Sequence, residues 1–269
     1  MKTFIYITCF LMTFTVLPAN AAIDNLSQAL NESGRLRMLS QRLAKAYLLK
    51  AMDIQPDVVN KQLLDSAQKF EQNLIDLKEF SASINHSDTL RVAIDVIDLQ
   101  WQAYYKVLSQ TQNSAPPDTI LTLSDRTLLA CESLVVQLEK ITQRQSAQWV
   151  NLSGRQRMLS QRIAKLYSAI SLSGHKDLYD DSLQQSVHEF DIALQALIKS
   201  PDNTHFVKHK LKKVATQWNF SKQGFKSLKK GNSTPLVIFM TTESILNQMN
   251  DITALYEEID NQKKRMATI

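Results

Sequence analysis

The chain has 269 residues, with 31 lysines and arginines against 26 aspartates and glutamates, and a formal net charge of +5. This mild positive charge gives little support to nucleic-acid binding and is compatible with small anionic ligands. Five glycines and six prolines are few for this length, which favours long helices over a β architecture. After residue 22 the sequence contains one cysteine, Cys131. A hydrophobic core, and no internal disulfide, must therefore hold the fold together.

The first 22 residues have the pattern of a cleaved secretory signal peptide. Lys2 gives a short positive start, an apolar run extends from Phe4 to Leu17, and Ala19-Asn20-Ala21 has the small residues of a cleavage site. The apolar run is shorter than the roughly 20 residues that a membrane-spanning helix needs. We therefore expect a periplasmic protein, with an uncleaved N-terminal anchor as the alternative.

Apolar residues spaced three and four apart predict helices along the rest of the chain. The first three expected helices cover residues 24–52, 56–80 and 87–111. In the third, one face carries Leu90, Ile94, Ile97, Trp101, Tyr104 and Leu108. No glycine or proline follows Asp118 until Gly154, so we expect one continuous helix from Asp118 to about Ser171.

One segment occurs twice. Residues 31–47, NESGRLRMLSQRLAKAY, return as residues 151–167, NLSGRQRMLSQRIAKLY, with 13 of 17 positions identical. The apolar pattern of the helices around each copy repeats as well. The sequence therefore predicts an all-α fold of two tandem antiparallel four-helix-bundle units, related by a pseudo-twofold axis and joined by the long continuous helix. We assign residues 1–22 to the signal peptide, 23–142 to the first unit and 143–269 to the second.

Both copies contain a glycine inside a helix, Gly34 and Gly154, although glycine there costs about 1 kcal/mol relative to alanine. Its use is to let another backbone approach closely. Packing the two motif helices together brings Arg37 and Arg157 face to face. Two such charges about 4 Å apart, at an effective dielectric near 20, repel by about 4 kcal/mol. Because the second copy lacks the acid of the first at Glu32, we expect few nearby carboxylates and infer a bound anion.

The other polar motif residues allow structural interpretations. Solvated positions are expected for Arg35, Arg155, Lys45 and Lys165, ion pairs with neighbouring helices for Arg42 and Arg162, and packing for Met38 and Met158. Trp101 and Trp218 are expected in the core. His205 and His209 have a spacing that can chelate a metal, but no third ligand is evident, so we interpret them as surface residues. No catalytic constellation is readable, and we expect no enzyme.

The segments GRLRMLSQRLAK and GRQRMLSQRIAK resemble the P-box of the periplasmic nitrate/nitrite sensor domains of NarX-type histidine kinases, and the N-terminal domain of PilJ-type chemotaxis transducers. The resemblance implies a four-helix sensor that dimerises through the P-box helix. One nitrate then lies on the dimer axis, held by the arginine before the methionine of each subunit. Those arginines are Arg37 and Arg157 here, with Arg42 and Arg162 in supporting roles. Since both halves lie on one chain, we expect a monomer that acts as an internal pseudo-dimer.

From this resemblance we expect an exported protein that binds a small oxyanion, nitrate or nitrite, and relays the bound state to a membrane-bound histidine kinase or chemotaxis receptor. No cofactor, metal or nucleic acid is expected. The predicted ligand-binding residues are Arg37, Arg157, Gly34, Gly154, Met38, Met158, Gln41, Gln161, Arg42 and Arg162. The alternative is a helical adaptor, in which the motif packs the two halves together and binds no anion.

Overall fold

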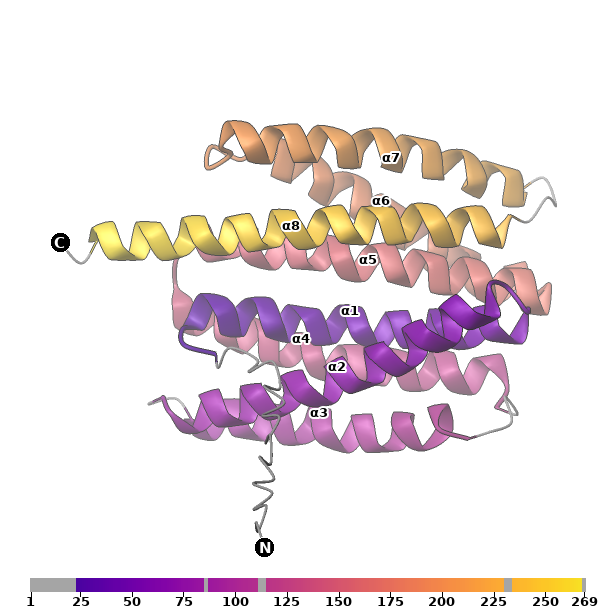
Figure 1. Ribbon diagram of the computed structural model, residues 1–269, viewed down its shortest axis with the longest axis horizontal. Helices are drawn as coiled ribbons and strands as arrows, with labels where there is room; N and C mark the ends of the chain where they lie inside the picture. The colour runs from indigo at the N-terminus through magenta and orange to yellow at the C-terminus, as the bar shows by residue number, and fades with distance from the viewer. Residues whose placement is uncertain (1–22, 85–86, 111–114, 230–233, 268–269) are drawn as a thin grey trace, which may run out of the picture.

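The computed structural model describes residues 23–84, 87–110, 115–229 and 234–267. The predicted signal peptide, residues 1–22, lies outside the described residues. Across these ranges the chain forms eight helices and no strand (Figure 1), which confirms the all-α prediction. None of the described helices is both long and apolar enough to cross a membrane.

The helices are α1 (Leu26–Ala51), α2 (Pro56–Ala82), α3 (Ser87–Leu108), α4 (Pro117–Thr142), α5 (Gln145–Ser173), α6 (Lys176–Ile198), α7 (His205–Lys229) and α8 (Pro235–Ala267). Local signals explain several of their starts. The side chain of Asn25 caps α1 by accepting a hydrogen bond from the backbone nitrogen of Gln28 at 3.0 Å. α2, α4 and α8 each begin with proline, which has no N–H to leave unpaired there.

Each half of the chain forms a four-helix bundle, α1–α4 and α5–α8. In Figure 1 the helices α1, α4, α5 and α8 occupy the middle of the molecule, with α2 and α3 on one side and α6 and α7 on the other. The two motif helices, α1 and α5, run side by side in the same direction and make the main contact between the bundles. A single continuous apolar core extends through both halves.

The duplication is visible in the core. In the first bundle the rings of Phe70 and Trp101 stack with centroids 4.2 Å apart. The equivalent residues of the second bundle, Phe190 and Trp218, have centroids 4.1 Å apart. All four are buried, which confirms the core positions predicted for the two tryptophans. Such a pair contributes about 0.5–1.5 kcal/mol beyond its burial, so each bundle has its own aromatic anchor.

The prediction of one continuous helix over residues 118–171 is wrong. α4 ends at Thr142, α5 begins at Gln145, and the chain reverses direction between them (Figure 1). Gln143 adopts the left-handed conformation, with φ of 48°, and donates its backbone N–H to the carbonyl of Glu139 at 3.2 Å. A residue other than glycine costs about 1–2 kcal/mol in this conformation. The turn was hidden in the sequence because a glutamine occupies the position where a glycine would mark it.

Tertiary hydrogen bonds hold this reversal. The buried carboxylate of Asp260 in α8 accepts hydrogen bonds from Arg144 Nη2 at 2.5 Å and Nε at 3.1 Å. It also accepts from the hydroxyls of Ser27 in α1 and Ser146 in α5. Burial alone would raise the pKa of Asp260, but these donors outweigh it and hold the pKa below its usual range. One carboxylate therefore joins three helices beside the turn.

Replacing Gln143 with glycine should stabilise the protein. The substitution removes the Cβ that disfavours the left-handed conformation, and we expect the free energy of unfolding to rise by up to about 1 kcal/mol. Gln143→Ala keeps the Cβ and should give no gain. Urea denaturation followed by circular dichroism measures both variants. An equal gain from alanine would show that backbone strain at this turn is not the cause.

Candidate functional site

The two motif helices bring Arg37 and Arg157 together over the two glycines. A Cβ atom added to Gly34 would lie 3.4 Å from the Nη2 atom of Arg37 and 3.4 Å from the Nη2 atom of Arg157. Apart from the backbone of α1 itself, these are the atoms nearest to it. The same two atoms lie 3.3 and 3.5 Å from the Cβ position on Gly154. The glycines therefore make room for guanidinium groups. Our expectation that they admit the opposing backbone is wrong, since no backbone atom of the other helix is among these neighbours.

Arg37 is fully buried and is held by partners from the other motif helix and from α4. Its Nη2 donates to Asn151 Oδ1 at 2.8 Å, and its Nη1 donates to Glu132 Oε2 at 2.8 Å. Glu132 is partly exposed and also lies 3.7 Å from Arg155. The first arginine thus has both an amide partner and a carboxylate counter-ion.

Arg157 has amide partners in place of a carboxylate. Its Nη2 donates to Asn31 at two atoms, Oδ1 at 2.7 Å and the backbone carbonyl at 3.1 Å. Its Nη1 donates to Asn250 Oδ1 at 3.4 Å. Among the described residues it forms no ion pair. Burial, followed by repulsion from Arg35, lowers the pKa of Arg157 to about 9, against the opposing effects of Glu32 and Glu257.

The Nε atoms of Arg37 and Arg157 are both buried without a hydrogen-bond partner in the described structure. A buried donor that lacks an acceptor costs about 1–3 kcal/mol, and more when it is charged. The two copies therefore keep the same unsatisfied donor, one on each side of the pseudo-twofold axis. An arginine offers such donors in a planar arrangement that matches a planar oxyanion.

Sequence reasoning missed Asn31 and Asn151, although each is the first residue of its motif copy. Each asparagine bonds to the arginine of the opposite helix, so the two contacts cross the axis reciprocally. Glutamates hold the amide nitrogens: Asn31 Nδ2 donates to Glu257 Oε2 at 2.6 Å, and Asn151 Nδ2 donates to Glu139 Oε2 at 2.8 Å. The identity of both asparagines in the repeat was the signal that would have found them.

The expectation of few carboxylates near the arginines is also wrong. Glu132 contacts Arg37 directly, while Glu139 and Glu257 lie one residue further out, behind the asparagines. These acids belong to α4 and α8, far from the motif in sequence, so a search of the motif itself could not locate them. Burial raises the pKa of Glu257. Even so, none of these carboxylates pairs directly with Arg157.

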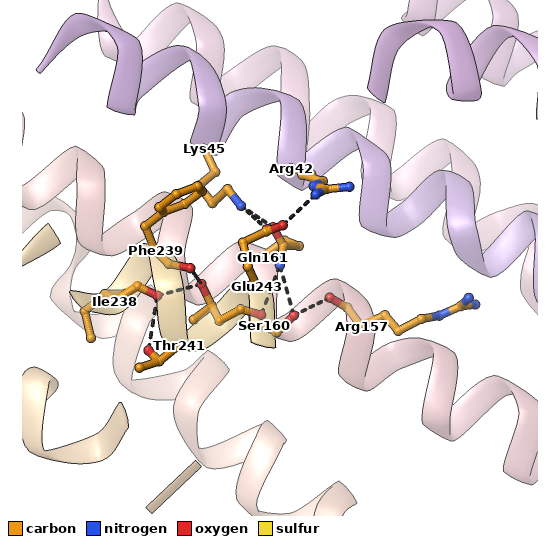
Figure 2. A network of polar contacts seen from close by, with 10 residues as sticks. Arg42, Lys45, Arg157, Ser160, Gln161, Ile238, Phe239, Thr241 and Glu243 are labelled. Atoms are coloured by element: carbon orange, nitrogen blue, oxygen red, sulfur yellow. Dashed lines mark hydrogen bonds and ion pairs between the residues drawn. The ribbon is translucent and has the colours of Figure 1, made fainter. Parts of the chain in front are cut away.

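A second buried polar layer lies further along α1 and α5. Lys45 Nζ donates to Gln161 Oε1 at 2.6 Å and forms an ion pair with Glu243 of α8 (Figure 2). In the other half Lys165 Nζ pairs with Asp125 Oδ1 of α4 at 2.8 Å. Each lysine thus reaches a helix of the opposite bundle. Both side chains are fully buried, so the interpretation of these two lysines as solvated residues is wrong, and they form part of the contact between the bundles.

The other predicted site residues flank these two layers. Met38 and Met158 are buried in the core. Gln41 is fully buried and donates to the carbonyl of Ser124 at 3.1 Å. Arg42 pairs with Glu243 at 2.5 Å, which agrees with the ion pair expected for it.

Several motif residues stand further from the arginine pair. Arg162 lines a groove between α4 and α6, where Glu189 also lies. Arg35 and Arg155 are partly exposed and pair with Glu32 at 3.3 Å and with Glu189 at 2.8 Å. These residues therefore border the contact between the bundles and do not touch its axis.

The two buried guanidinium groups at the axis carry hydrogen-bond donors of the kind that suit an anion. Arginine remains protonated near neutral pH, so Arg37 and Arg157 can donate hydrogen bonds but are poor proton acceptors. Within the described ranges no group of three or more histidine, cysteine, aspartate or glutamate side chains is placed to hold a metal ion. His205 and His209 are both exposed on α7, as expected for surface residues.

Paired motif helices that bury two arginines between four-helix bundles define a tandem helical-bundle module. The family model of type IV pili methyl-accepting chemotaxis transducer N-terminal domains, PilJ, matches the chain twice, at residues 19–127 and 142–252. The chain belongs to this family of sensor domains, and carries it in two tandem copies. Comparisons with curated proteins and with solved structures give no match.

Substitutions at Gly34 test whether the glycines make room for the arginines. Gly34→Ala places a Cβ 3.4 Å from both Nη2 atoms, a tight contact that the gain in helix propensity of about 1 kcal/mol offsets. Gly34→Leu fills the guanidinium space, and we expect it to lower the free energy of unfolding by about 1–3 kcal/mol. Urea denaturation measures both. A leucine variant as stable as the alanine variant would contradict this geometry.

The buried lysines predict an unusual dependence of stability on pH. Burial is the main cause that lowers the pKa of Lys45 and of Lys165 from 10.5 to about 8, against the opposing effects of Glu243 and Asp125. Between these two values the unfolded chain binds more protons than the folded chain, so this contribution to stability rises with pH. A double variant, Lys45→Met with Lys165→Met, removes this pH-dependent contribution to the free energy of unfolding.

The measurement is urea denaturation of both proteins across pH 8 to 10. We expect the free energy of unfolding of the unaltered protein, relative to the double variant, to increase over this range. A difference that stays constant or falls would show that the lysines keep their ordinary pKa.

Proposed function

We propose that the chain is a periplasmic sensor module that binds one small oxyanion, nitrate or nitrite, between α1 and α5. The observation that carries the proposal is Arg157, which is 1% exposed and has no carboxylate partner among the described residues. A buried charge without a counter-ion is expensive. Family membership supports the sensing role, and the predicted signal peptide supports export.

The anion would accept hydrogen bonds from donors that have no partner in the described structure. Its oxygens accept from the unpaired Nε atoms of Arg37 and Arg157, and its charge offsets the repulsion between the two guanidinium groups. Asn31 and Asn151 hold each arginine in place from the opposite helix. The arginines are therefore preorganised, which limits the entropy lost on binding.

Binding at this position can change how the two bundles pack. The arginines lie in the main contact between the halves, and the lysine layer continues that contact along the same helices. An anion that binds one arrangement of α1 and α5 more tightly shifts the population towards it. We propose that a membrane-bound histidine kinase or chemotaxis receptor reads this arrangement, with the chain acting as a monomeric internal pseudo-dimer.

Calorimetric titration with nitrate, nitrite, chloride and sulfate tests the proposal. We expect saturable binding of nitrate or nitrite at one site per chain. Arg37→Ala and Arg157→Ala should each weaken it at least a hundredfold, which corresponds to about 2.7 kcal/mol. Arg155→Ala is the matched control, since Arg155 is 40% exposed and two residues from Arg157, and it should retain binding. Retained affinity in both arginine variants would refute the site.

A second function is favoured by the bonds of Arg37. Its amide and carboxylate partners already satisfy two of its nitrogens, as expected if the motif only packs the two halves of a helical adaptor. That function predicts no anion affinity in a folded sample. It also predicts that Arg37→Met changes the free energy of unfolding little, because Glu132, the carboxylate that loses its partner, is 30% exposed and can be hydrated.

A further inference from the structure

A groove at the boundary between the bundles has the features of a second ligand site. Its volume is about 630 Å³, and it lies between α2 of the first bundle and α8 of the second, with Arg42 of α1 also contributing. Its other lining residues include Val58, Lys61, Gln62, Asp65, Met240 and Gln248. Neither Arg37 nor Arg157 lines the groove, so it is separate from the oxyanion site.

Unpaired polar atoms gather around this groove. Arg42 Nε, Gln62 Oε1 and Gln248 Oε1 are all buried without a hydrogen-bond partner in the described structure. Gln62 is only 8% exposed. Leaving each such atom unpaired costs about 1–3 kcal/mol. A ligand that offers an acceptor to the arginine and donors to the two amides would recover this energy.

The remaining lining residues combine two charge signs with an apolar surface. Lys61 and Asp65 are exposed, lie one turn apart on α2, and take part in no ion pair among the described residues. Val58 and Met240 are 51% and 62% exposed, and Phe239 lies beside Met240 in the lining. The groove therefore offers a cation, acceptors and an apolar wall within one small volume.

We propose that this groove binds a zwitterionic α-amino acid with an apolar side chain. Its carboxylate is recognised by Arg42 and Lys61. Its ammonium group donates to the amides of Gln62 and Gln248, and its side chain packs against Met240. Both charged groups of the ligand are required, because each meets a partner of opposite charge or polarity.

The duplication supplies an internal comparison. The groove that contains Arg162, the equivalent of Arg42, lies between α4 and α6 and has a volume of about 160 Å³. At the offset of 120 residues, Lys61, Gln62 and Asp65 correspond to aspartate, serine and glutamine at positions 181, 182 and 185. The second half therefore has neither a lysine at position 181 nor a long amide at position 182, where the first groove has Lys61 and Gln62. One amino-acid site per chain follows.

The proposed site is connected to the contact between the motif helices. Arg42 pairs with Glu243 at 2.5 Å, Glu243 also pairs with Lys45, and Lys45 donates to Gln161 of α5 at 2.6 Å (Figure 2). A ligand carboxylate on Arg42 competes with Glu243 for the same guanidinium. A ligand in the groove would therefore change the contacts of Glu243 and Lys45, which belong to the polar layer that joins the two bundles.

Calorimetric titration of the full chain with L-leucine, L-methionine and L-phenylalanine tests the proposal. We expect at least one of them to bind at one site per chain. The amide of that amino acid, which lacks the carboxylate, and its deaminated acid, which lacks the ammonium group, should each bind at least tenfold more weakly. Absence of saturation with all three at millimolar concentration, or equal binding of either analogue, would overturn the proposal.

Two variants locate the site. Gln62→Leu removes the buried amide and should weaken binding at least tenfold, whereas Ser182→Leu, at the equivalent position of α6, should leave it unchanged. Met240→Glu alters an exposed side chain, so it tests the groove without disturbing the core, and should also weaken binding at least tenfold. Unchanged affinity in both groove variants, or an equal loss in Ser182→Leu, would overturn the assignment. Nitrate titration of the same variants separates this outcome from loss of the oxyanion site.

Discussion

The burial of two arginines between parallel helices is the constraint on which the structure depends. Gly34 and Gly154 leave the space in which both guanidinium groups lie, and a side chain as large as leucine at Gly34 would fill that space. Each arginine is fixed by an asparagine of the opposite helix. The contact between the bundles therefore contains two buried guanidinium groups, and its stability depends on the partners that compensate their positive charge.

Carrying both copies on one chain has allowed the two halves of the site to differ. A symmetric pair of subunits must offer the same partners on both sides, but among the described residues Arg37 has Glu132 and Arg157 has only amide groups as partners. One arginine thus has a carboxylate counter-ion, and the other is the arginine that we propose to bind the anion. A singly charged oxyanion suits this arrangement better than a doubly charged one, because only one positive charge remains uncompensated.

The repeat made the fold and the arginine pair predictable, because two near-identical helices of one chain are expected to pack around an axis. What the sequence could not show depended on distant contacts. Glu132 and Asp260 are brought in by α4 and α8, and the turn at Gln143 is held by bonds to Asp260 from the neighbouring Arg144. The burial of Lys45 was missed because a lysine within a motif helix resembles a surface residue until its partner on α8 is known.

We have proposed that Arg37 and Arg157 form one anion site on the axis. Nuclear magnetic resonance of the arginine Nε–H groups during a nitrate titration tests this site, since both Nε atoms are buried and have no hydrogen-bond partner in the described structure. We expect the signals of these two arginines to shift together, with one dissociation constant and saturation at one nitrate per chain. Shifts confined to partly exposed arginines such as Arg155, with these two signals unmoved, would contradict it.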